Sequence, residues 1–305
     1  MGNPLYRVRA SGSGGSGYGI PPLPDQAYRS IKNADGNQID VAVDEDGKPV
    51  IVPGITTVLK QGNQDGIAHW AAQQTAAYAV THIDSLLSRT EEAGYGFLQY
   101  HWKREPDWES DDLLTAYDRV LHDSAELGTA VHDYLEWRLG GEHGFAPELN
   151  KPEFRQMAEQ VDLWLFENKV EAHAIEETWW GDHYAGTLDL VATVNGVPYL
   201  LDAKTSRNVQ SSHKRQLAAL HHANKPYKVD DKGNWYVADK PHYEQFGFLH
   251  IRPDDWDSKG NFIPAFCRLE VVDGAELDVH WKAFQGLLQV ARSEQELKKL
   301  AKAGR

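Results

Sequence analysis

Cysteine is almost absent from this chain of 305 residues, which contains only Cys267. A single cysteine excludes a disulfide within the chain and excludes zinc or iron–sulfur sites built from four cysteines. Long apolar runs are missing too. No stretch approaches the roughly 20 residues needed to cross a membrane, and the N-terminus lacks the apolar core of a signal peptide. We therefore expect a soluble, cytoplasmic protein.

Positive charge is also scarce. The 31 lysines and arginines face 45 acids, and the net charge of −14 argues against a general nucleic-acid coat protein. Residues 201–240 differ, because eight lysines and arginines and four acids give this segment a charge of +4. Two interpretations remain open for it: a solvated loop, or a local basic track for a phosphate backbone.

Composition and length predict a globular chain with a substantial core, since 41% of the residues are hydrophobic. Residues 1–27 contain a Gly/Ser run and a Pro-rich piece, which predict a flexible N-terminal segment. Residues 28–110 predict a hairpin with its turn near Asp46-Gly47, followed by helices. Residues 111–305 would then form the main core.

Helices and strands alternate along the rest of the chain. Helices are expected at 67–82, 111–139, 152–169, 209–223 and 276–301, and strands at 172–180, 244–251 and 265–272. Residues 225–240 are expected to be an excursion between elements. This order predicts an α/β fold with a mixed central β-sheet flanked by helices.

The strongest local signal is GTLDLVATVNGVPYLLDAKT, residues 186–205. Asn195-Gly196 suits a two-residue type I′ turn, because both residues tolerate positive φ. The two flanking runs would then pair as antiparallel strands, with Val194 opposite Val197.

Extending this register places Asp189 opposite Asp202 and Thr187 opposite Lys204 on one face, with the alternating leucines facing a core. Two opposed carboxylates repel each other, so removing either should raise thermal stability, and a cation between them would relieve the repulsion. Carboxylate oxygens suit Mg²⁺ or Mn²⁺, and Lys204 could stabilise charge on a phosphate. The alternative is a surface hairpin with an exposed Asp202–Lys204 pair. The apolar run 199–201 favours the metal site.

Two further acid or histidine signals lie upstream. His132 and Glu136 are four residues apart within a predicted helix and share one face. A core histidine with a carboxylate partner is the alternative to a ligand there. Glu176 and Glu177 face opposite ways on the predicted strand 172–180, so only one of them can point to the metal face.

The chain resembles the RecB-like branch of the PD-(D/E)XK nuclease superfamily, which includes phage exonucleases and CRISPR-associated iron–sulfur nucleases. Four blocks in the family's order carry the resemblance: GTAVHDYLE (128–136), EETWW (176–180), GTLDL (186–190) and LLDAKTS (200–206). The resemblance implies a restriction-endonuclease-like core at 111–305 with a helical N-terminal part. It also implies a Mg²⁺- or Mn²⁺-dependent DNA nuclease, an exonuclease in phage or bacterial DNA processing or recombination.

Residue by residue, the resemblance implies that His132, Asp189 and Asp202 bind the metal. It implies that Lys204 is catalytic together with the two aspartates. Glu176 matches the family's upstream acid, with Glu177 as the alternative.

DNA contacts are expected from the basic segment, at Gln216, Lys214, Arg215 and Arg207. The family often has a tyrosine four residues after this glutamine, where the chain has Leu220, and the cluster cysteines of the iron–sulfur members are absent. DNA is the expected partner, with a recombination or single-strand-binding protein as a further one, in the cytoplasm of a bacterial host cell if a phage encodes the chain. The alternatives are a structure-selective or restriction-like endonuclease, and a pseudonuclease that binds DNA without cutting it.

Overall fold

A computed structural model gives the fold of residues 6–9, 16–62, 65–93, 116–141, 148, 150–257 and 259–303. The chain forms two compact units, Met1–Gly62 with Ala130–Arg305, and Asn63–Thr129. The second unit contains α2 (Asp65–Thr81), α3 (Ile83–Ala93) and the first part of α5 (Ala116–Arg138). The helix predicted at 67–82 is thus confirmed. The boundary predicted between residues 110 and 111 lies outside the described residues.

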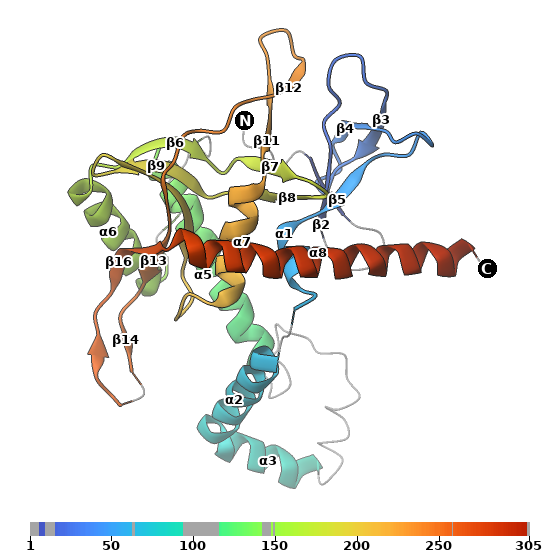
Figure 1. Ribbon diagram of the computed structural model, residues 1–305. Helices are drawn as coiled ribbons and strands as arrows, with labels where there is room; N and C mark the ends of the chain where they lie inside the picture. Colours follow the sequence, from blue (N-terminus) through green and yellow to red (C-terminus); the bar gives the residue numbers. More distant parts are fainter. Residues whose placement is uncertain are drawn as a thin grey trace. The chain divides into compact units, whose positions relative to one another are not determined.

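A five-stranded mixed sheet forms the centre of the first unit (Figure 1). Its strand order is β16 (Phe266–Val272), β13 (Gln245–Arg252), β10 (Val197–Lys204), β9 (Leu190–Val194) and β6 (Glu171–Ile175). β10 and β13 run parallel, and every other neighbouring pair is antiparallel. The prediction of an α/β fold with a mixed central sheet is therefore confirmed.

The hairpin of β9 and β10 has the predicted turn and the predicted register. Asn195 and Gly196 have φ values of 50° and 85°, and Val197 pairs with Val194. The ladder ends at Leu201 and Leu190, however. The prediction that Asp189 and Thr187 continue it opposite Asp202 and Lys204 is wrong, because Thr187 and Asp189 precede β9 and lie outside the central sheet.

The strand directly before β9 belongs to a second sheet, which has four strands. Its strand order is β12 (Trp235–Val237), β11 (Lys225–Val229), β7 (Thr178–Gly181) and β8 (Tyr184–Thr187). The single strand predicted at 172–180 is two strands, β6 and β7, in different sheets. The break lies at Glu176, which has a φ of +49°. Two hydrogen bonds close the crossing: Glu176 N donates to Asp189 O at 3.1 Å, and Leu188 N donates to Glu177 O at 2.9 Å.

Helices cover the central sheet. Helices α1 (Ile55–Leu59), α7 (Ser211–His222) and α8 (Gly274–Ala303) share one core with the sheet. In that core Leu200 and Phe248 of the sheet meet Leu217 of α7 and Phe284 of α8. Helix α6 (Pro152–Glu167) packs against β13 and β16. None of the helices in the described ranges is long and apolar enough to cross a membrane.

Both sides of β10 are buried, which corrects the prediction of a single core face. Leu200 and Leu201 alternate along the strand, and they are 0% and 1% exposed. Asp202 therefore lies on a covered face, below α7, and is itself fully buried.

Two strands lie within the segment 1–27 that was predicted to be flexible. β1 (Arg7–Arg9) and β2 (Ser16–Gly19) form a three-stranded sheet with β5 (Ile51–Pro53), whereas most of the Gly/Ser run, residues 11–15, lies outside the described residues. Tyr6 and Val8 are buried, and Trp180 Nε1 donates to the carbonyl of Gly19 at 3.1 Å. β3 (Tyr28–Lys32) pairs with β4 (Gln38–Ala42) as a separate ribbon.

Four turns repeat one hydrogen-bond pattern, in the segments NADGN (33–37), DEDGK (44–48), DDKGN (230–234) and DSKGN (257–261). In each, the first side chain accepts from the backbone N–H groups of the third and fifth residues at 2.8–3.0 Å. The fourth residue is a glycine with φ between 74° and 86°, a conformation that glycine adopts without steric cost. The turn predicted near Asp46-Gly47 is confirmed, although β5 pairs with β2 and not with β4.

Two of these turns belong to hairpins that replace or extend the prediction. Residues 225–240, expected as an excursion, contain the hairpin of β11 and β12. The short hairpin of β14 (Asp255–Trp256) and β15 (Phe262–Ile263) was not predicted.

Candidate active site

His132, Glu176 and Asp189 converge at the point where the chain crosses between the two sheets. His132 is on α5, and the two acids lie at the paired breaks of β6–β7 and β8–β9. His132 Nδ1 lies 3.6 Å from Asp189 Oδ2 and 3.9 Å from Glu176 Oε1. One donor atom from each residue fits within a 4.8 Å span. The backbone hydrogen bond between Glu176 and Asp189 fixes the two acids relative to each other.

The Asp189 side chain takes over the backbone ladder where β9 ends. Its Oδ2 accepts from the backbone N–H of Ala203 at 2.7 Å. This bond satisfies a donor of β10 that has lost its strand partner. It also fixes Asp189 beside the C-terminal end of β10, which carries Asp202 and Lys204.

Asp202 and Lys204 form a buried ion pair at that end of β10. The side chain of Asp202 is 0% exposed and that of Lys204 is 14% exposed. Gln216 Nε2, on α7, donates to Asp202 Oδ1 at 3.1 Å. Asp202 Oδ2 contacts the Lys204 ammonium and makes no hydrogen bond within the described residues.

Burial and the neighbouring charges shift the pKa values of Asp202, Lys204 and His132. Burial raises the pKa of Asp202 to about 6, while Lys204 opposes this rise and Asp189 adds to it. Burial lowers the pKa of Lys204, but Asp202 and Asp189 outweigh it, so the net shift is upward. Burial likewise opposes the charged form of His132, yet Asp189 and Glu176 raise its pKa to about 9. The carboxylates therefore dominate the local field, which favours cations.

The donor set of His132, Glu176 and Asp189 fits a divalent metal. Two carboxylates and one imidazole suit Mn²⁺ well, and the carboxylates alone suit Mg²⁺. The only other such group in the described ranges is His122, Asp123 and Glu126, which lies on α5 in the second unit. Asp202 is not a member of the first group. Gln216 donates to its Oδ1, and the Lys204 ammonium contacts its Oδ2. Its predicted role as a ligand stays a prediction.

The four residues predicted to contact DNA are in different settings. Gln216 donates to Asp202, and Lys214 Nζ pairs with Glu276 Oε1 at 2.6 Å. The Arg215 guanidinium lies beside Gly62. The side chain of Arg207 is 60% exposed, and its Nη2 donates to the carbonyl of Trp256 at 2.9 Å. Their DNA contacts stay predictions.

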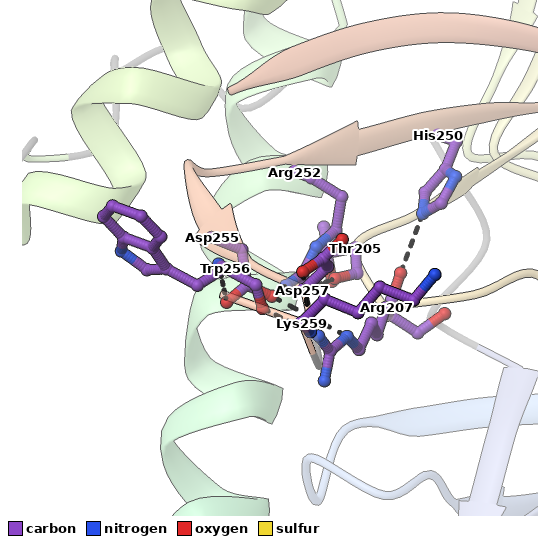
Figure 2. Close-up of polar contacts among 9 residues, drawn as sticks. Thr205, Arg207, His250, Arg252, Asp255, Trp256, Asp257 and Lys259 are labelled. Atoms are coloured by element: carbon purple, nitrogen blue, oxygen red, sulfur yellow. Dashed lines mark hydrogen bonds and ion pairs between the residues drawn. The ribbon is translucent and has the colours of Figure 1, made fainter. Parts of the chain in front are cut away.

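Sequence reasoning missed the groups that hold the segment directly after Lys204 (Figure 2). His250 is buried on β13, opposite Lys204 in register. Its Nε2 donates to the carbonyl of Ser206 at 2.8 Å, and its Nδ1 contacts Glu270 Oε1 at 2.8 Å. Arg252 Nη1 donates to the carbonyl of Thr205 at 2.8 Å. The sequence did offer a sign of these contacts, because His250 and Arg252 are polar residues in the largely apolar run QFGFLHIR (245–252).

A second histidine near the site was also missed. His213 Nδ1 accepts from the backbone N–H of Gln210 at 3.1 Å and so helps to cap α7. Burial lowers its pKa to about 4, with Lys204 adding to the shift, so the imidazole is neutral at pH 7. The His213 side chain thereby fixes the start of the helix that carries Gln216.

Comparisons with known proteins give a distant structural likeness. No protein-family model matches the chain, and no curated protein does. The chain is similar to LHK-Exo in complex with dAMP, with a TM-score of 0.31 and 12% identity over 59% of this chain and 96% of that one. It is also similar to another structure of LHK-Exo, an alkaline exonuclease from Laribacter hongkongensis, with a TM-score of 0.27 and 12% identity over 58% of this chain and 93% of that one.

Proposed function

We propose that this chain is a Mg²⁺- or Mn²⁺-dependent DNA nuclease that acts as an exonuclease, built on a PD-(D/E)XK-type core. The observation that carries the proposal is the convergence of His132, Glu176 and Asp189 beside the buried Asp202–Lys204 pair. These residues come from four separate segments of the sequence. They are also the residues that the four sequence blocks single out.

Each residue has a distinct part in this proposal. His132, Glu176 and Asp189 would hold the metal, which when bound would act as a Lewis acid and lower the pKa of a water molecule. Lys204 places a positive charge where the phosphate oxygens gain negative charge during hydrolysis. Its raised pKa keeps the ammonium protonated.

Two residues orient this machinery. Asp202 holds the Lys204 ammonium through Oδ2, and Gln216 donates to its other oxygen, Oδ1. Because the carboxylate is buried, its orientation depends on these two contacts. A positioning role for Gln216 is thus our proposal in addition to the DNA contact predicted for it.

A gel with end-labelled linear DNA and covalently closed circular DNA tests the proposal. With Mg²⁺ or Mn²⁺ the linear DNA should be degraded from its ends and the circle should stay intact, and EDTA should stop the reaction. Asp189→Asn should abolish degradation, because it removes a charged ligand but keeps an oxygen to accept from Ala203 N–H. The matched control is Asp182→Asn, which breaks the exposed pair with Lys225 and should leave the activity unchanged.

The other outcomes separate the alternatives. Cleavage of the circle would identify an endonuclease instead. If the protein bound DNA but cleaved it with neither Mg²⁺ nor Mn²⁺, the nuclease proposal would be refuted and a pseudonuclease favoured. Full activity of Asp189→Asn would refute the assignment of the site.

A further inference from the structure

The short hairpin of β14 and β15 presents two aromatic side chains to solvent. Trp256 and Phe262 are directly opposite each other, with ring centroids 5.3 Å apart in an edge-to-face arrangement. They are 61% and 54% exposed. Exposing two paired rings leaves a large apolar area in water, which burial against a ligand would recover.

The hairpin is held tightly at its tip. Asp257 accepts from the backbone N–H groups of Lys259 and Asn261, each at 2.8 Å, and Gly260 N donates to Asp257 O at 3.0 Å. Hydrogen bonds among the described residues of the turn, 257 and 259–261, thus connect the two strands that carry the rings.

The base of the hairpin is tied to the segment directly after Lys204 (Figure 2). Arg252 donates to the carbonyl of Thr205 and, through Nη2, to Asp255 Oδ2 at 3.2 Å. Arg207 Nη2 donates to the backbone carbonyl of Trp256 itself. The aromatic pair is thus connected to the end of β10 by a chain of hydrogen bonds.

The charges around the pair suit an anionic chain despite the acids in the hairpin. Asp255 faces Arg252 and also Arg207, whose Nε lies 3.8 Å from its Oδ2. The oxygens of Asp257 accept from backbone N–H groups and from the Asn261 amide. Asp255 is thereby paired with two arginines and the oxygens of Asp257 accept hydrogen bonds, while the neighbouring Asp254 is exposed and the Arg207 side chain stays 60% exposed.

We propose that Trp256 and Phe262 form a stacking platform for unpaired bases of a DNA strand, and that Arg207 meets the phosphates of the same strand. The inference rests on the proposed nuclease function and names the contact that grips the substrate beyond the metal site. Stacking suits this pair, because every base has an aromatic face and the interaction requires no particular sequence. A protein partner fits less well, because two rings among charged residues offer far less than the roughly 800 Å² that each partner buries in a stable interface.

Binding of two oligonucleotides in EDTA tests the platform without any cleavage. One is a fluorescently labelled oligo-dT, and the other is an abasic strand of equal length, which has the same phosphates but no bases. By fluorescence anisotropy, Trp256→Ala and Phe262→Ala should each weaken oligo-dT binding by about fivefold or more. Binding of the abasic strand should be unchanged.

The matched control is Tyr236→Ala. Tyr236 is 44% exposed on β12, in a hairpin with the same type of turn, but β12 pairs with β11 in the second sheet. This variant should bind both strands as the unaltered protein does. Melting curves should be unchanged for all three variants, since the side chains are exposed.

Other results would overturn the platform. Equal weakening for both strands would point to a phosphate or structural effect, and no weakening would leave the rings without this role. Failure of the unaltered protein to prefer oligo-dT over the abasic strand would also refute it. The nuclease proposal is decided separately by the gel with Mg²⁺ and Mn²⁺: a protein that prefers oligo-dT through Trp256 but never cuts would keep the platform and refute the nuclease.

Discussion

Replacing Asp202 by alanine should destabilise the protein, although the sequence alone suggested the opposite. An opposed pair of aspartates would lose its repulsion, worth ~0.2–1 kcal/mol across a strand pair. In the structure, however, the Lys204 side chain is only 14% exposed, and the same change leaves its ammonium without its buried partner. Breaking one side of a buried ion pair costs ~3–5 kcal/mol. The larger effect decides the sign, so we expect a net loss of ~2–5 kcal/mol.

Urea unfolding in EDTA at pH 7.5 measures this loss. At that pH Asp202, with a pKa of about 6, is ionised in the unaltered protein. The double variant Asp202→Ala/Lys204→Met should recover more than half of the loss, because it removes the stranded charge. Asp182→Ala breaks an exposed pair with Lys225 and should change stability by at most ~1 kcal/mol.

A clear result would refute this reasoning. If Asp202→Ala were as stable as the unaltered protein, or more stable, repulsion would outweigh the buried pair. If the double variant were no more stable than Asp202→Ala, the loss would have another origin than the unpaired ammonium.

Three further predictions concern the lysine and two histidines. Lys204→Ala should lower turnover by ~10²–10³-fold and leave Mn²⁺ affinity by calorimetry unchanged; a matching loss of affinity would contradict its role. His132→Ala should weaken activation by Mn²⁺ more than by Mg²⁺ in activity titrations, since imidazole is the softer ligand; equal effects would argue for a structural histidine. Burial lowers the pKa of His221 to about 4, whereas the unfolded chain binds the proton below ~6.5, so stability should fall as pH drops from ~6.5 to 4. His221→Gln should reduce the difference in melting temperature between pH 7.5 and 4.5, and an unchanged difference would contradict this.

The sequence predicted the hairpin of β9 and β10 well because its information is local. Asn195-Gly196 selects one turn type, and that turn fixes the pairing from Val197 and Val194 to Leu201 and Leu190. The mixed character of the sheet also follows from the order of helices and strands.

The crossing between sheets could not be predicted in this way. The alternation of polar and apolar residues is the same whether a strand continues in one sheet or passes into another. This alternation extends through Asp189 and Thr187, so it gave no sign that the ladder stops. What ends the ladder is non-local: the Asp189 carboxylate accepts from Ala203 N–H, and Glu176 adopts a φ of +49°. The family resemblance pointed to His132, Glu176, Asp189 and Asp202, and the structure brings the first three together. Glu176 and Asp189, however, lie at breaks between strands and not within strands, and the roles of all four stay predictions.

The ion pair of Asp202 and Lys204 illustrates a second limit. Their spacing of two residues places both on one face of a strand. Whether that face is open or covered depends on α7, whose Gln216 reaches Asp202 only in the folded chain. Burial changes the sign of the stability prediction, as argued for Asp202→Ala.

The turns NADGN, DEDGK, DDKGN and DSKGN share one hydrogen-bond pattern, so the side chains that they carry can be exchanged from one turn to another. Its hydrogen bonds involve the side chain of the first residue and the backbone, with glycine in fourth place, so the side chains at the second and third places can vary. The third place holds Asp35 and Asp46 in two turns and Lys232 and Lys259 in the others. One exchange of aspartate and lysine at the third place thus changes the charge of a tip by two units at unchanged backbone. The affinity of each loop for a polyanion could then be adjusted independently of the fold.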